Sequence, residues 1–173
     1  DQRSEMQKSK DLNKEKSAII TGASRGIGLS IAKRLAQEGF KCAIVGRERS
    51  KIEQAAREIS TSTNSVVLPL VADVSEWTEC EGVAQSVLNE FGSIDVLVPN
   101  AGIGIIGSVE EASPLDWAKM IEINYLGTAQ MIKAVLPTMK RQGEGDVIAI
   151  VSAGGTKGYP EWSGYCAAKW AVM

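Results

Sequence analysis

Short apolar runs alternate with longer amphipathic stretches from residue 17 onward, and this alternation restricts the fold more than any other feature of the sequence. The apolar runs are rich in Val, Ile and Leu, which is typical of strands buried on both faces. They occupy residues 17–21, 41–46, 65–73, 94–100 and 145–152. Helical stretches occupy residues 28–40, 49–60, 76–92 and 113–141, and the tail from 162 onward. Strands separated by helices in this way predict an α/β domain, a parallel sheet with helices on both faces.

Serine and proline residues predict several element boundaries. Ser113 and Pro114 occupy the N-cap and the first position of the longest helix. Pro137 is expected to kink that helix or to end its last turn. Ser75 is expected to cap the helix that follows it, and Pro69 is expected near the end of its strand.

The chain of 173 residues is long enough for one domain with a sizeable core. Residues 1–16 are polar, with mixed charge and no apolar periodicity, and we expect them to form a disordered leader. A remnant of a targeting peptide remains an alternative for this segment. Residues 17–173 form the expected domain, and no apolar run in them approaches the ~20 residues of a membrane span. The net charge of −2 indicates neither a nucleic acid nor a membrane as partner.

The sequence contains no histidine, and this excludes Ser-His-Asp and Cys-His mechanisms and most catalytic zinc sites. Any acid–base chemistry must use Tyr, Lys, Asp, Glu or Cys. Cys42, Cys80 and Cys166 are widely spaced, which fits neither a disulfide framework nor a metal site. We therefore expect no bound metal and a reducing compartment, the cytoplasm or an organelle matrix. Without a histidine to activate it, Cys166 is interpreted as a packing residue.

The stretch TGASRGIG joins the first apolar run to the first helix. Gly22, Gly26 and Gly28 would let the backbone approach a ligand closely, and the helix start behind them would present free N–H groups to a phosphate. Ser24 and Ile27 belong to the same expected binding turn. The same letters also suit a tight turn without a ligand.

In NAD-binding domains, an acidic residue at the end of the second strand usually holds the adenosine ribose. In this sequence Gly46 and Arg47 occupy that position, and Glu48 follows them. Arg25 lies in the glycine turn itself. Two guanidinium groups that converge on a 2′-phosphate favour NADP(H) over NAD. The alternative is that both arginines are solvated.

The sequence now resembles the short-chain dehydrogenase/reductase family, in its standard single-domain form, from about Ser17 to the last residue. The markers come in order: TGxxxGxG at 21–28, Asp73, NAG at 100–102, Asn124, Ser152, and YxxxK at 165–169. The resemblance implies a Rossmann-like, doubly wound parallel sheet. It also implies that two further strands should follow, so the last strands of the fold are missing from this chain. The pattern is most similar to 3-oxoacyl-carrier-protein reductases and generic ketone reductases.

The resemblance assigns several residues to the cofactor. Asp73 and Val74 would hold the adenine, and Asn100, Ala101 and Gly102 would line the adenosine ribose and steady the central strand. Without the resemblance to the family, these residues would indicate only the end of a strand and a turn. The sequence departs from the family at Pro99, where a second asparagine is common; this removes no reactive group.

Tyr165 and Lys169 are four residues apart, so on a helix they share one face. An ammonium group close to a phenol favours the phenolate, although a Tyr-Lys pair at this spacing also occurs on ordinary helix surfaces. Of the three tyrosines, only Tyr165 is followed by lysine at this distance. Ser152 ends the fifth apolar run and could donate a second hydrogen bond to a substrate oxygen. We interpret the flanking Tyr159 and Trp162 as lining a substrate pocket, with an interface as the alternative.

The resemblance implies hydride transfer between NADP(H) and a carbonyl or secondary alcohol, with Tyr165 as general acid/base, assisted by Ser152 and Lys169. Asn124 would complete a proton relay through a water behind the lysine. The family also implies a homodimer or homotetramer formed through the helices 113–141 and 162–173. The alternative is a non-catalytic, truncated dinucleotide-binding protein that acts by association with a partner, and we expect the isolated 173 residues to have little or no reductase activity.

Overall fold

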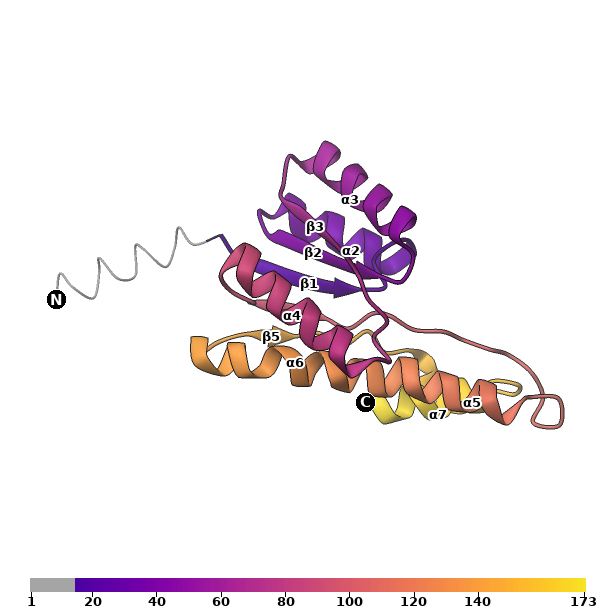
Figure 1. Ribbon diagram of the computed structural model, residues 1–173. Coiled ribbons are helices and arrows are strands. Elements are labelled where there is room, and N and C mark those ends of the chain that lie inside the picture. Colours follow the sequence, from indigo (N-terminus) through magenta and orange to yellow (C-terminus); the bar gives the residue numbers. More distant parts are fainter. Residues whose placement is uncertain (1–14) are drawn as a thin grey trace, which may run out of the picture.

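The computed structural model describes residues 15–173, and its centre is a five-stranded parallel sheet in the order β3-β2-β1-β4-β5 (Figure 1). The expected α/β architecture is confirmed. The strands are β1 (Ser17–Thr21), β2 (Lys41–Gly46), β3 (Val67–Val71), β4 (Val96–Val98) and β5 (Asp146–Val147). The crossover from β3, at one edge, to β4, beside β1, reverses the direction in which strands are added. In an open α/β sheet, a ligand cleft forms outside the carboxyl ends of the strands at such a reversal.

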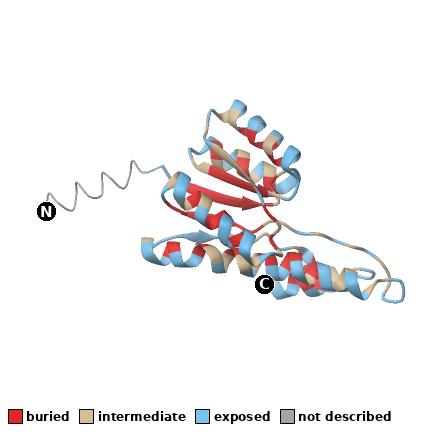
Figure 2. Ribbon diagram, viewed as in Figure 1, coloured by how far each residue is buried: buried red, intermediate tan, exposed pale blue. Residues whose placement is uncertain are grey.

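Helices cover both faces of this sheet. The helices of the described residues are α2 (Gly26–Gln37), α3 (Arg49–Thr63), α4 (Trp77–Phe91), α5 (Pro114–Met120), α6 (Gly127–Gln142) and α7 (Ser163–Val172). Of these, α5 and α7 pack against each other and lie outside the two layers on the sheet. One core cluster joins α2 and α3 to the strand face that carries Ala18 and Ile20, and the other joins α4 and α6 to the face that carries Ile19. The buried residues accordingly concentrate in β1, β2 and the inner sides of the helices (Figure 2). Burial on both faces explains why these strands are continuously apolar in the sequence.

The longest helical segment was expected as one helix, and its course is continuous but not uniform. Its middle, Ile121–Leu126, is a π-helical turn, called η1, between α5 and α6. Ser113 caps the segment as expected, because its side chain accepts a hydrogen bond from the backbone N–H of Leu115, and Pro114 takes the first turn. Pro137 does not end the helix, which continues to Gln142.

Three local expectations were wrong. Pro69 lies in the middle of β3, paired with Ile44; an edge strand tolerates this because one side of its backbone has no neighbour to bond. Ser75 does not cap α4, since its amide and hydroxyl both donate to Asp73 Oδ1. The fifth strand is limited to Asp146–Val147, although backbone bonds from Ile148 to Leu97 and from Ile150 to Pro99 continue its course along β4.

The expected leader lies, except for its last two residues, outside the described residues. Glu15 forms an ion pair of 2.8 Å with Lys41, and the backbone of Lys16 accepts a hydrogen bond from the same residue. Within residues 15–173, no helix combines the length and the apolar character that a membrane crossing requires.

Candidate active site

The glycine turn between β1 and α2 packs against the segment that leaves β4. Gly22 has φ +65°, and a Cβ there would come 2.8 Å from the Cα of Ala101. A Cβ on Gly28 would come 2.5 Å from the side-chain nitrogen of Asn100. These glycines are therefore required by close packing between two loops, and Gly28 does not line the cavity described below.

Hydrogen bonds hold the same two loops together. The Thr21 hydroxyl accepts from the backbone N–H groups of Asn100 and Ala101, both at 3.0 Å. In return, Asn100 Nδ2 donates to the carbonyl oxygens of Thr21 and Gly22, at 2.9 and 3.2 Å. Asn100 thus steadies the central strands, as the resemblance implied. Thr21 was not singled out from the sequence, although its place at the end of a strand next to the glycine turn was a usable signal.

A cavity of about 340 Å³ opens at the carboxyl ends of β1, β2, β3 and β4. It brings together nearly all the residues assigned to the cofactor: Gly22, Ser24, Arg25, Gly26, Ile27, Arg47, Asp73, Val74, Asn100, Ala101 and Gly102. Sequence reasoning missed other lining residues, namely Val45, Gly46, Ala72, Ile103 and Ile123, which gave no polar signal. Tyr165 and Lys169 are not part of this lining.

The lining suits a dinucleotide. Gly26, the first residue of α2, has φ +59° and open space where a Cβ would point, so the backbone at the helix start is accessible. No side chain caps this end of α2, which leaves its first N–H groups to an anion. Arg25 and Arg47 add two guanidinium groups to the wall. An adenosine phosphate therefore finds amide donors and positive charge in one cavity.

Arg47 and Asp73 face each other across this cavity. Their charged atoms are 3.7 Å apart, and the Arg47 side chain is 58% exposed, which leaves it free to turn toward a ligand. Burial alone would raise the pKa of Asp73, but hydrogen bonds from the amide and hydroxyl of Ser75 and the Arg47 charge outweigh it and lower the pKa. Glu48, the acid next to Arg47, instead bonds Lys51 and Ser50 within its own helix.

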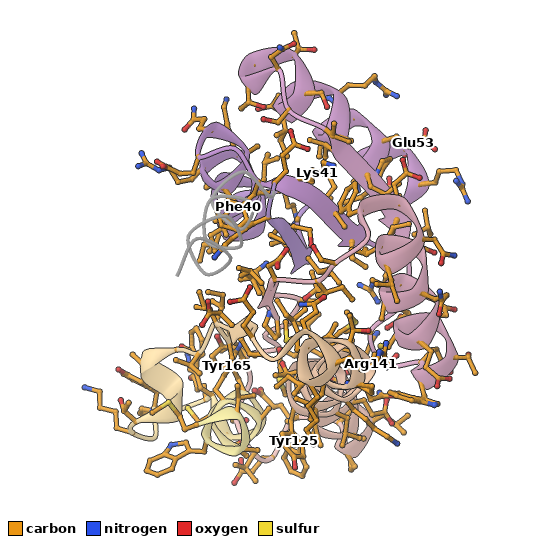
Figure 3. All side chains as sticks on the ribbon, turned by 90° about the vertical axis from the view of Figure 1, so that its left-hand side faces the viewer. Phe40, Lys41, Glu53, Tyr125, Arg141 and Tyr165 are labelled. Carbon is orange, nitrogen blue, oxygen red and sulfur yellow. The ribbon has the colours of Figure 1, made fainter. Side chains whose placement is uncertain are left out.

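Lys169 is buried in α7, 6% exposed, and its Nζ donates to the carbonyl oxygen of Ile150 at 3.0 Å. Burial lowers the pKa of this ammonium group. Nζ lies 5.9 Å from the ring centroid of Tyr165, so the pair shares one face of the helix as expected. The Trp162 ring meets the Tyr165 ring edge-on at 5.3 Å. In Figure 3, Tyr165 lies on the side of α7 nearest the sheet, whereas Tyr125 lies at the outer edge of the molecule.

Asn124 is fully buried in η1 and holds the chain just after the NAG run. Its Oδ1 accepts from the N–H of Ile103 at 3.0 Å, and its Nδ2 donates to the carbonyl of the same residue at 2.9 Å. A Cβ on Gly102 would lie 2.5 Å from Asn124 Oδ1 and 3.7 Å from Lys169 Nζ. Gly102 therefore sits at the junction of the cavity, the asparagine and the lysine.

Ser152 begins the 3₁₀ turn η2 (Ala153–Gly155), and its hydroxyl oxygen accepts from the N–H of Gly154 at 3.1 Å. The hydroxyl proton is not engaged in this bond and remains available to an oxygen acceptor. A Cβ on Gly154 would come 3.2 Å from Tyr165 Cε1. Gly154 thus links Ser152 to Tyr165, which brings together the two groups expected to contact a substrate oxygen.

The cysteines offer no exposed thiol within the described residues, since Cys42, Cys80 and Cys166 are all buried and free. Burial raises the pKa of Cys42 to about 12. Burial first, and then the charges of Glu79 and Asp73, raise the pKa of Cys80 to about 11. Such thiols remain protonated near neutral pH and do not act as nucleophiles.

Comparisons with known proteins agree with this geometry. The family model described as short chain dehydrogenase matches residues 16–173. An uncharacterized oxidoreductase of Staphylococcus saprophyticus is 37% identical over 91% of this chain and 68% of its own length. A 3-oxoacyl-[acyl-carrier-protein] reductase of Staphylococcus epidermidis is 36% identical over 91% of this chain and 65% of its own length. The alcohol dehydrogenase from the archaeon Thermococcus sibiricus, complexed with 5-hydroxy-NADP, superimposes with a TM-score of 0.87 at 38% identity, over 91% of this chain and 67% of that one.

These matches extend over almost all of the described residues. The chain spans between 60% and 68% of the length of the curated relatives. The expected resemblance is therefore confirmed by a model that covers the glycine turn, the NAG run and the Tyr-Lys helix together. The chain belongs to the short-chain dehydrogenase family.

Proposed function

We propose that the protein transfers hydride between NADP(H) and a carbonyl or secondary alcohol, with residues 17–173 as its dinucleotide-binding domain. The observation that carries this proposal is the junction at Gly102, where the wall of the dinucleotide cavity meets the buried Lys169 ammonium and Asn124. A bound reduced nicotinamide would supply hydride at this junction. The proteins that resemble this chain include dehydrogenases and a reductase, which supports the same reaction class.

Residues of this chain would supply the proton, the hydrogen bonds and the positive charge that the reaction needs. Tyr165 donates a proton to the substrate oxygen, and Ser152 donates a hydrogen bond to the same oxygen as charge develops on it. Lys169 supplies positive charge near the phenol and can turn its donors toward ribose hydroxyls. Asn124 fixes the backbone after Gly102 and would hold the water of a proton relay behind the lysine.

NADP(H) is the proposed cofactor because the cavity wall carries Arg25 and Arg47, while Glu48, the acid that follows Arg47, bonds Lys51 instead. The relative from Thermococcus sibiricus, whose structure contains 5-hydroxy-NADP, supports this choice. Arg47→Asp should lower the ratio of NADPH affinity to NADH affinity about tenfold or more, since it removes a charged donor and adds a repulsive charge.

Arg49→Asp is the matched control for that substitution, because Arg49 is exposed, pairs with Glu53 and does not line the cavity. The control should leave the ratio as in wild type. An unchanged ratio in Arg47→Asp would reject the NADP assignment.

Tyr165→Phe is the direct test of the chemistry. Because the isolated 173 residues are expected to have little or no reductase activity, the assay uses the whole protein, in which reduction of a test ketone should fall on the order of a hundredfold or more once the proton donor is lost. Binding of NADPH should change little. Tyr125→Phe removes the hydroxyl of an exposed tyrosine outside the cavity and should leave the rate unchanged. Full activity in Tyr165→Phe would contradict the proposal.

Dinucleotide binding without catalysis, by association with a partner, is a second candidate. One observation favours it: the cavity around the glycine turn is lined without Tyr165 and Lys169. NADPH binding by wild type with no turnover of any tested ketone would support this candidate, whereas turnover that depends on Tyr165 would reject it.

A further inference from the structure

The loop of residues 72–76, between β3 and α4, forms one wall of the cavity through Ala72, Asp73 and Val74. On the side of the neighbouring strand, the N–H of Ala72 donates to the carbonyl of Gly46 at 3.1 Å. The loop also bonds itself and the helix that follows it. Ser75 donates to Asp73 Oδ1, and the N–H of Asp73 donates to the Glu79 carboxylate at 2.7 Å. These bonds hold the loop to β2 and to the start of α4, and a third element bonds its carbonyl groups at Val74 and Ser75.

That element is α6. Gln130 Nε2 donates to two consecutive carbonyl oxygens of the loop, Val74 at 3.2 Å and Ser75 at 3.0 Å. The side chain is partly buried, and it reaches the loop from 55 residues along the chain. Carbonyl groups at a loop bend need donors, and one amide NH₂ provides two of them.

The packing beneath this bond is equally close. A Cβ on Gly127, one turn before Gln130, would come 2.6 Å from Val74 Cγ2. The backbone of α6 therefore contacts the loop at Gly127, and the side chain of Gln130 binds the loop through two hydrogen bonds. The loop cannot move toward the helix, and it cannot move away without breaking two hydrogen bonds.

We infer that Gln130 is a positioning residue for the adenosine half of the cofactor: it fixes the 72–76 loop, and so Asp73 and Val74, in the conformation that receives the adenine. This inference rests on the proposed dinucleotide binding. Gln130 does not line the cavity and acts only through the loop. Its loss should therefore weaken adenosine binding without altering the groups around Tyr165.

The chain offers a control of the same residue type at the other end of the same helix. Gln142 Oε1 accepts a hydrogen bond from the N–H of Ile94, and Gln142 Nε2 donates to the carbonyl oxygen of the same residue, each at 2.9 Å. Ile94 lies just before β4, at the amino ends of the strands and so opposite the cavity. Replacing either glutamine by leucine removes comparable hydrogen bonds, so both variants should lower the melting temperature. Only Gln130→Leu should change the binding of the adenosine half.

The probe is adenosine 2′,5′-bisphosphate, which carries the adenosine half alone, and its dissociation constant is measured by titration calorimetry. Gln130→Leu should raise that constant about fivefold or more, which corresponds to the loss of a net hydrogen-bond contribution in the loop. Gln142→Leu should bind as wild type does. Gln130→Arg keeps N–H donors at the position and should restore part of the affinity. In assays of the whole protein, the KM for NADPH should rise in Gln130→Leu while kcat stays near the wild-type value.

The outcomes distinguish dinucleotide binding by the protein from the positioning role of Gln130. Wild type that does not bind the bisphosphate would reject dinucleotide binding itself. Wild type that binds, together with Gln130→Leu of equal affinity, would reject the role of Gln130 alone. Equal weakening in Gln130→Leu and Gln142→Leu would show a general loss of stability and would also reject that role.

Discussion

Lys169 is the residue at which function and stability oppose each other most directly. The residue is only 6% exposed, and the one hydrogen bond that its ammonium group makes in the described structure goes to the carbonyl oxygen of Ile150. A buried charge with few partners costs free energy, and replacing it by an apolar side chain is often neutral or stabilising. The fold therefore keeps this lysine at a cost in stability, which fits the proposed role of its ammonium group.

Lys169→Met should consequently abolish ketone reduction and still unfold at the wild-type temperature or a few degrees above it, since about 1 kcal/mol corresponds to roughly 2–4 °C at this size. Differential scanning calorimetry measures the melting temperature of both proteins. Lys119→Met, an exposed lysine in α5, is the control and should leave the activity intact. A strongly destabilised Lys169→Met would mean that the ammonium supports the fold.

The lowered pKa of Lys169 gives this comparison a pH dependence. Between the lowered folded value and the ordinary value of 10.5, the unfolded chain binds more protons than the folded chain, so stability contributed by this group rises with pH. The melting temperature of wild type relative to Lys169→Met should therefore increase as the pH is raised through this window. A difference that stays constant from pH 7 to pH 10 would contradict the assigned shift.

Gly102 makes a second prediction for a single residue. Gly102→Ala would force a Cβ to within 2.5 Å of Asn124 Oδ1 and so displace the side chain that holds Ile103. We expect ketone reduction to fall at least tenfold, as positioning errors near a reaction centre do. Gly107→Ala, in the same segment with open space around its Cβ, should retain the wild-type rate. Equal rates in the two variants would argue against a tight junction at Gly102.

Individual site residues could be assigned from the sequence where a short pattern fixes them. The glycine turn, the NAG run and the Tyr165–Lys169 spacing all correspond to close contacts in the structure. Partners that are distant in sequence could not be assigned, because no local pattern encodes them. The bonds from Gln130 to residues 74 and 75 are of this kind, and so is the Arg47–Asp73 ion pair.

Among the elements, the segment from α5 to α6 shows what hydrophobic periodicity in the sequence can and cannot predict. Apolar spacing and the Ser113 cap predict a long helix, and both are found. The π-helical turn between the two helices was not predicted, because one extra residue in a turn barely changes the hydrophobic pattern. That turn carries the buried Asn124, so the irregular part of the helix coincides with the candidate site.

Helix α4 offers a test of element stability away from the site. Gly82 is exposed in its middle, and a Cβ there would meet nothing within 4 Å. Gly82→Ala should stabilise the protein by about 0.5–1 kcal/mol, because alanine loses less backbone freedom in a helix than glycine does. Thermal unfolding measures the gain. Gly127→Ala is the opposing case, since its Cβ would overlap Val74, and it should lower the melting temperature.

At the scale of the whole molecule, two surfaces carry several of the exposed large apolar side chains. One is the β5 edge, with Val147, Ile148 and Val151, where the sheet has no further strand among the described residues. The other is the outer side of the long helical segment and α7, with Leu115, Leu126, Leu136 and Trp170. Exposed apolar patches of this kind mark contact surfaces.

The parallel sheet and the helices on both of its faces could be predicted, because apolar runs and helices alternate along the chain. The length of the edge strand could not. The sequence 145–152 is apolar enough for a full strand, yet the regular strand is limited to Asp146–Val147, and beyond it only the backbone bonds of Ile148 and Ile150 follow β4. The length over which such a strand pairs depends on the assembled sheet, and no residue pattern within the strand predicts it.

The helical surface yields the last prediction, which concerns assembly. If the protein forms a homodimer or homotetramer through the helices 113–141 and 162–173, Leu126→Glu should place a charge in that contact and lower the mass found by sedimentation equilibrium. Val66→Glu is the matched control, because Val66 is similarly exposed but precedes β3 at the far edge of the sheet. It should leave the mass unchanged. A monomeric wild type, or an oligomer that Leu126→Glu does not weaken, would reject this interface, and weakening by both variants would point to general loss of structure.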